Sequence, residues 1–212
     1  MKIFSFRNIP IHLHPSFLML AVVGVAYSWI HEGLSVAITV CIMGTMLFTS
    51  VLLHEIGHAS MARAFNISTR SITLYPFGGI ALIEREPESE SQEFFVALAG
   101  PAANFIIACF ALPIALLEQQ IVPWLLWINV LMGIFNLIPA YPTDGGRILR
   151  SWLSGRMGKT KATKISLNVS IVLAFTFFIS GIVFSWLGLT LVGIFLLYAI
   201  NQEKKRYAKL GR

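Results

Sequence analysis

Hydrophobic residues in this chain run in long blocks and rarely alternate with polar ones. The blocks cover approximately residues 16–30, 34–65, 94–117, 121–138, 165–186 and 189–200. About 20 consecutive apolar residues cross a bilayer as a helix. The pattern predicts an all-α polytopic membrane protein with six transmembrane helices, which form a single domain over residues 1–212.

The segment between the second and third blocks has a different pattern. Its start alternates branched or aromatic residues with polar ones, Gly78 and Gly79 follow, and residues 84–93 are acidic. Alternation is typical of a half-buried strand, and paired glycines mark a turn or a close backbone approach. We expect a small β hairpin or sheet here, on the cytoplasmic side of the membrane.

Composition and charge support a membrane location. The 212 residues are 56% hydrophobic and only 12% charged, whereas soluble domains have about 25% charged residues. All 16 Lys and Arg fall at 2–7, 63–85, 147–164 and 204–212, and the turns near Glu32, Glu118 and Gly188 contain none. Because Lys and Arg stay on the cytoplasmic side, both termini are predicted to be cytoplasmic. Topology and contact with anionic lipid explain the net charge of +6, so no nucleic acid partner is expected.

The second block contains three ionisable groups, His54, Glu55 and His58. Residues four apart lie on the same face of a helix, so the two imidazoles can share one metal ion. Glu55 is displaced by about 100°, near enough to reach a water at the metal without being a ligand. This HExxH spacing is typical of zinc-dependent peptide hydrolysis. The alternative is a histidine pair satisfied by interhelical hydrogen bonds, but a buried Glu in a membrane helix favours the functional interpretation.

A catalytic zinc site usually has a third protein ligand. Asp144, the only Asp in the chain, follows Pro139 and Pro142 and precedes Gly145 and Gly146. The prolines break the fourth block, and a broken backbone at membrane depth is tolerated beside a water-filled cavity. Asp144 is therefore the preferred third ligand, with helix capping as the alternative for Asp144 and His14 as the alternative ligand.

These motifs together resemble the site-2 protease family of intramembrane zinc metalloproteases. The resemblance rests on HEIGH at 54–58, on N-x-x-P-x-x-P-x-D-G-G from Asn136 to Gly146, on YPFGGIA and on LAGPAANF. It is strongest toward the compact prokaryotic type, which includes enzymes that process sporulation pro-sigma factors, and no CBS or PDZ domain is expected.

The resemblance implies an intramembrane zinc metalloendopeptidase in a prokaryotic plasma membrane. His54, His58 and Asp144 are expected to bind one Zn²⁺ per chain, with Glu55 as the catalytic base and acid. The implied substrates are membrane-tethered proteins such as transcription regulators, anti-sigma factors or remnant signal peptides.

Other polar and small residues have less defined roles. Asn136 is expected to hold substrate or stabilise the oxyanion, with plain packing as the alternative. An exposed edge near residues 72–82, including Gly78 and Gly79, is expected to receive unwound substrate as an added strand. Asn104 is expected to support the site structurally.

Two non-enzymatic interpretations stay open from the sequence. The first is a metal-binding membrane protein or metal transporter with the same three ligands, although no inverted repeat supports transport. The second is an inactive pseudoprotease that serves as an adaptor, against which the presence of Glu55 argues.

Overall fold

The computed structural model describes residues 1–76 and 78–209, and Phe77 and residues 210–212, including the basic Arg212, lie outside the described residues. The chain divides into two compact units. One unit comprises Met1–Pro87 and Ala99–Gly133, and the other comprises Glu88–Leu98 and Ile134–Arg212. Helices α3 (Glu90–Leu117) and α4 (Val122–Leu137) each contribute to both units.

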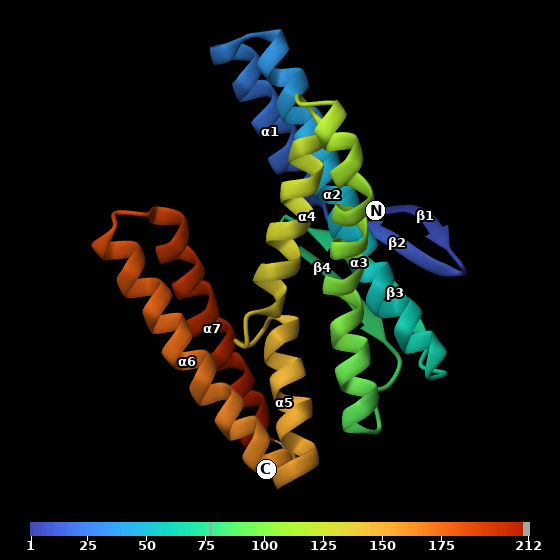
Figure 1. Ribbon diagram of the computed structural model, residues 1–212, viewed down its shortest axis with the longest axis vertical. Coiled ribbons are helices and arrows are strands. Elements are labelled where there is room, and N and C mark those ends of the chain that lie inside the picture. Colours follow the sequence, from blue (N-terminus) through green and yellow to red (C-terminus); the bar gives the residue numbers. More distant parts are fainter. Residues whose placement is uncertain (77, 210–212) are drawn as a thin grey trace. The chain divides into compact units, whose positions relative to one another are not determined.

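The first unit contains a helical hairpin and a four-stranded sheet (Figure 1). The hairpin is formed by α1 (Pro15–Glu32) and α2 (Leu34–Ala64), joined at Gly33. The strands are β1 (Lys2–Phe6), β2 (Ile9–Leu13), β3 (Thr69–Tyr75) and β4 (Gly78–Ile83), arranged in that order across the sheet. β1 and β2 are antiparallel, β2 and β3 are parallel, and β3 and β4 are antiparallel.

The predicted hairpin between the second and third apolar blocks is present as β3 and β4, but the sheet is larger than predicted. Residues 2–13 form a second hairpin whose turn has positive φ at Arg7 and Asn8, as two-residue hairpin turns prefer. Ile11 pairs with Ile72 and Leu13 with Leu74. These four side chains are buried together with Ala59 of α2, so one face of the sheet packs on the helix that carries HEIGH.

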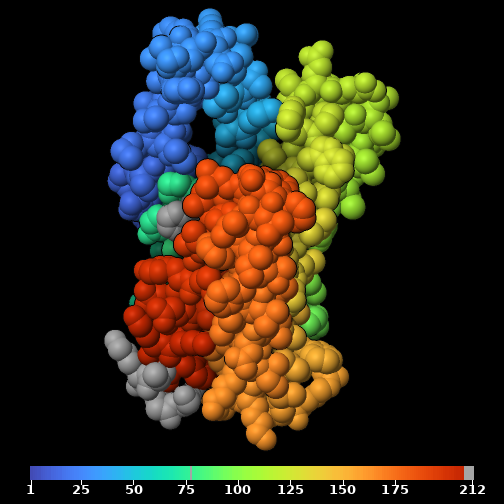
Figure 2. Space-filling model, turned by 90° about the vertical axis from the view of Figure 1, so that its left-hand side faces the viewer, coloured from blue at the N-terminus to red at the C-terminus, as the bar shows by residue number. Residues whose placement is uncertain are grey.

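The second unit contains α5 (Asp144–Met157), α6 (Lys159–Val183) and α7 (Leu187–Lys209). α6 and α7 lie side by side along their lengths (Figures 1 and 2). A Cβ atom on Gly193 of α7 would lie 2.6 Å from the backbone nitrogen of Phe178 on α6, so glycine is needed for this close approach. Ala140, from the segment before α5, is fully buried with Leu167 of α6 and Leu196 of α7.

Apolar side chains cover much of the helix surfaces. On α6 the exposed residues Phe175, Ile179 and Ile182 form one stripe, which is typical of a surface that contacts lipid. Within the described residues, three helices are long and apolar enough to cross a membrane: α2, α3 and α6. α4 is a shorter apolar helix. The chain is a membrane protein, and six spans stay a prediction.

Candidate metal centre

The histidine pair lies in the buried part of α2. His54 and His58 are only 5% and 8% exposed, and their Nε2 atoms are 3.1 Å apart. The two rings meet edge to face, with centroids 4.7 Å apart. The one-turn spacing therefore directs both Nε2 atoms to the same point, as two ligands of one ion require.

Gly100 of α3 forms the wall behind the two rings. A Cβ atom at this position would lie 2.7 Å from His54 Nε2 and would overlap the His58 ring. The backbones of α2 and α3 also approach closely at Gly57, where an added Cβ would lie 2.6 Å from the carbonyl oxygen of Ala99. Glycines at both contacts leave room for the histidine rings between the helices.

A chain of buried hydrogen bonds fixes the orientation of His54. Its Nδ1 lies 2.6 Å from Asn104 Oδ1. The Asn104 amide donates to Asn129 Oδ1 at 2.9 Å, and the Asn129 amide donates to Ser50 Oγ at 2.9 Å. Since the Asn104 nitrogen is used as a donor, its oxygen accepts from His54 Nδ1–H, which assigns the proton to Nδ1 and makes Nε2 the ligand atom.

The sequence interpretation included Asn104 as structural support but missed Asn129 and Ser50. Asn104 and Asn129 are fully buried, on α3 and α4. A polar side chain within an apolar helix is costly unless it is bonded. Asn129, a polar residue in the middle of the apolar stretch 122–137, was therefore a usable indication of a site residue.

Replacing Asn104 with Leu is expected to weaken zinc retention about 10- to 100-fold, because His54 loses the partner that fixes its tautomer. Zinc release to a competing chelator from purified protein measures this effect. Thr45→Val is the matched control, because the Thr45 hydroxyl is exposed and bonds only its own helix, at Cys41 O. Equal release rates from the two variants would show that the chain of hydrogen bonds does not support the site.

Glu55 is buried, at 9% exposure, on α2 beside strand β4. A Cβ atom on Gly79 would lie 2.7 Å from the Glu55 Cδ atom and 2.8 Å from Oε1. Gly78 has a φ of 141°, a backbone conformation that favours glycine. Glycine is therefore needed at the two positions for different reasons. At Gly78 it permits the positive φ at the start of β4, and at Gly79 it leaves space for the Glu55 carboxyl group.

Asp144 lies in the second unit, as the first residue of α5. It is buried, and its Oδ1 is 3.7 Å from Arg147 Nη1. The preceding residue, Thr143, occupies the N-cap position and donates its hydroxyl to Ala140 O at 2.8 Å instead of capping α5. Thr143, and not Asp144, is therefore the N-cap residue of α5.

The remaining predicted residues have separate places. Asn136 is half-buried in the last turn of α4. His14 accepts a hydrogen bond from the Ser16 backbone N–H at 3.2 Å and stacks on Tyr75, so it serves as the N-cap of α1. Within the described residues, the group that could hold one metal ion is His54, His58 and Asp144, each offering one ligand atom.

Comparison with known proteins gives a consistent result. Peptidase family M50 matches residues 42–120 and 118–177. The chain is 33% identical over 210 residues to Zinc metalloprotease MJ0392 of Methanocaldococcus jannaschii, a match that covers 96% of this chain and 60% of that protein. It is 27% identical over 165 residues to Stage IV sporulation protein FB of Bacillus subtilis, a match that covers 76% and 54%. The chain thus spans between 54% and 60% of the length of these relatives.

A solved structure of similar fold is the Site-2 Protease from Methanocaldococcus jannaschii. The match has a TM-score of 0.73 and 33% identity, and it covers 96% of this chain and 94% of the solved chain. The family resemblance found in the motifs is confirmed. This chain belongs to peptidase family M50 and has the site-2 protease fold.

Proposed function

We propose that this protein is an intramembrane zinc metalloendopeptidase that hydrolyses a peptide bond within or next to a transmembrane segment of a membrane-tethered protein. The observation that carries the proposal is the pair of Nε2 atoms, 3.1 Å apart, in the same helix turn as the buried Glu55. Metal binding alone needs the imidazoles, whereas peptide hydrolysis also needs a general base.

In this proposal His54, His58 and Asp144 hold one Zn²⁺. The donor set of two neutral imidazoles and one carboxylate suits catalytic zinc. When bound, zinc supplies a Lewis acid that polarises the scissile carbonyl and lowers the pKa of the attacking water. Glu55 takes the proton from that water and delivers it to the leaving amine. Asn136 holds the substrate or stabilises the oxyanion in the same reaction.

Strand β4 is the proposed place where the substrate binds. A peptide bond in a helix is already hydrogen-bonded, so the substrate has to unwind before it can be hydrolysed. β4 is the last strand in the order of the sheet, and it passes the Glu55 carboxyl group at Gly79. An unwound segment that added to this edge would place its backbone beside the general base.

Replacing Gly79 with Ala is expected to lower peptide hydrolysis about 10²-fold, because the methyl group displaces the Glu55 carboxyl group and an error of about 1 Å in a catalytic group has this cost. Zinc content should stay at the wild-type value. Cleavage of a model membrane substrate in detergent measures the loss, and Ile3→Val at an exposed position of β1, at the other end of the sheet order, is the control. If bulky residues at both Gly78 and Gly79 leave cleavage unchanged, the edge-strand proposal is wrong.

The proposed substrates are transcription regulators, anti-sigma factors or remnant signal peptides that are tethered to the membrane. The proposed location is the plasma membrane of a prokaryote, as a multi-pass protein with six spans and both termini cytoplasmic. The distribution of the 16 Lys and Arg residues supports this orientation. We also propose that residues 1–212 act as one protease domain, since the matches to the M50 family, at residues 42–120 and 118–177, cover segments of both units.

The ligand assignment is tested by Asp144→Asn. Loss of a charged ligand is expected to lower the zinc content well below about one ion per chain, and to accelerate zinc release by more than the roughly 100-fold that loss of a residue bonded to a ligand costs. Metal analysis of the purified protein measures both. Glu84→Gln is the control, because it neutralises an exposed carboxylate that pairs with Arg70. Wild-type zinc retention in Asp144→Asn would remove Asp144 from the ligand set.

A further inference from the structure

We propose that Glu203, through Tyr141 and Arg150, positions the segment that carries Asp144. The proposal rests on the function proposed above, in which Asp144 is a zinc ligand. The Asp144 loop is defined here as residues 138–143, between α4 and α5. All residues in the argument belong to the second unit.

The Asp144 loop is held on α6 by its backbone. Ala140 is fully buried between α6 and α7, and the Tyr141 backbone N–H donates to Ser170 Oγ at 2.7 Å. A Cβ atom on Gly146 would lie 2.7 Å from the Tyr141 backbone nitrogen, so the first turn of α5 folds directly over the loop. The position of the Asp144 backbone therefore depends on where the loop sits on α6.

The Tyr141 side chain extends the loop's attachment to α7. Its hydroxyl donates to Glu203 Oε2 at 3.1 Å. Burial, together with the charge of Glu203, raises the pKa of Tyr141 to about 12, so the phenol stays a donor at neutral pH. Glu203 is only 6% exposed, and a carboxylate buried to this degree requires partners.

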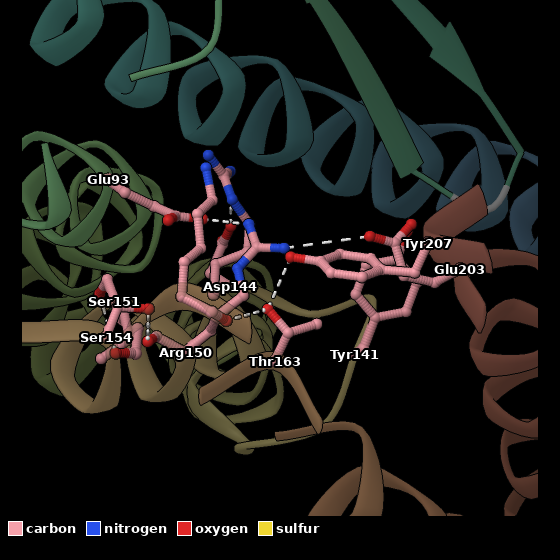
Figure 3. Close-up of polar contacts among 12 residues, drawn as sticks. Glu93, Tyr141, Asp144, Arg150, Ser151, Ser154, Thr163, Glu203 and Tyr207 are labelled. Carbon is pink, nitrogen blue, oxygen red and sulfur yellow. Dashed lines mark hydrogen bonds and ion pairs between the residues drawn. The ribbon is translucent and has the colours of Figure 1, made fainter. Parts of the chain in front are cut away.

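Arg150, in the second turn of α5, is a second partner of Glu203, which also lies 4.0 Å from Arg206 of its own helix. Its guanidinium lies between two carboxylates from different helices, as Figure 3 shows: Nη2 pairs with Glu93 of α3, and Nη1 lies 3.9 Å from Glu203 Oε1. Burial lowers the pKa of Arg150, but the adjacent Glu93 carboxylate more than offsets this effect and the pKa is raised. Arg150 is thus a permanent cation at this junction.

Glu203 therefore contacts residues that lie before and after Asp144 in the sequence. Tyr141 precedes Asp144 by three residues and donates a hydrogen bond to Oε2 of Glu203, and Arg150 follows Asp144 by six residues and forms an ion pair with Oε1. Fixing a segment on both sides limits how far the residue between them can move. A ligand held in position before the metal arrives retains the metal more strongly than one that must first be ordered.

The test compares two tyrosine variants, one in the Asp144 loop and one outside it. Tyr141→Phe removes the hydroxyl that bonds Glu203, and Tyr198→Phe removes the hydroxyl of an exposed tyrosine on α7. Glu203→Gln is the second loop variant, because it removes the charge that faces Arg150. Zinc release to a chelator is measured for each full-length protein in detergent, alongside thermal unfolding of the zinc-depleted form.

We expect zinc release about 10-fold faster from Tyr141→Phe and 10- to 100-fold faster from Glu203→Gln, since residues that orient a metal ligand have effects of this size. Tyr198→Phe should release zinc at the wild-type rate. Equal release from the Tyr141 and Tyr198 variants would overturn the proposal, whether both are fast or both are slow. If Glu203→Gln does not fold, Tyr141→Phe decides.

Asp144→Asn separates this proposal from the one on which it rests. If Asp144→Asn loses zinc while Tyr141→Phe and Glu203→Gln retain it as the wild type does, Asp144 is a ligand but Glu203 does not position it. If Asp144→Asn retains zinc as the wild type does, the ligand assignment fails and the positioning role fails with it.

Discussion

Replacing Glu55 with Gln is expected to lower the turnover of peptide hydrolysis by about 10² to 10⁴-fold, the usual contribution of a general base. Gln has the same shape and fits the same space beside Gly79, but it cannot accept the proton of the attacking water. The zinc content should stay at about one ion per chain, since Glu55 is not among the proposed ligands. Metal analysis and single-turnover cleavage of a membrane substrate in detergent measure the two properties.

Glu32→Gln is the control for this variant, because Glu32 is an exposed carboxylate at the end of α1 and its loss should not change turnover. A transporter or an adaptor would tolerate Glu55→Gln. Unchanged transport or adaptor activity in that variant would therefore favour those interpretations. Loss of zinc in Glu55→Gln would contradict the account in another way, because it would make Glu55 a ligand.

Replacing Gly100 with Ala is expected to abolish stable zinc binding and with it hydrolysis. The added methyl group would lie 2.7 Å from His54 Nε2 and would overlap the His58 ring. At least one imidazole has to rotate away, and a site with one histidine fewer does not hold catalytic zinc. Zinc content after purification and the rate of cleavage measure the effect.

Gly44→Ala is the matched control for Gly100→Ala. Gly44 lies in α2, and no atom lies within 4 Å of the position that its Cβ would occupy. In a helix this change is expected to stabilise the protein by about 0.4–1 kcal/mol through the unfolded chain. If Gly100→Ala behaved as Gly44→Ala does, with full zinc content, the close contact between α3 and the histidine rings would not exist in the working protein.

Local patterns in the sequence predicted the elements that depend on neighbours along the chain. The spacing of His54 and His58 fixes their common face on any helix, so their convergence follows from the sequence alone. The alternation in residues 69–75 likewise predicted β3. The broken approach to Asp144 indicated a loop before α5, and the structure has this loop at residues 138–143.

Contacts between distant segments were not predictable in this way. Residues 2–13 form strands because Ile11 and Leu13 pair with β3 about 60 residues away, and the sequence interpretation missed both strands. Asn129 bonds Ser50 across 79 positions. Arg150 was interpreted as a charge that sets topology and contacts anionic lipid, because its partner Glu93 lies 57 positions earlier. Such pairings depend on how helices pack, which periodicity does not encode. The roles of Asn136, Gly78 and Gly79 in substrate binding stay predictions.

Proteolysis in the membrane is tested by proteomics of membranes from host cells that express either the wild type or Glu55→Gln at matched levels. We expect truncated single-span proteins to accumulate uncleaved in cells with the variant, and to be cleaved within or next to their membrane segment in cells with the wild type. Identical fragments in both cells, with both purified forms holding zinc, would contradict proteolysis and favour a metal-binding protein that is not an enzyme.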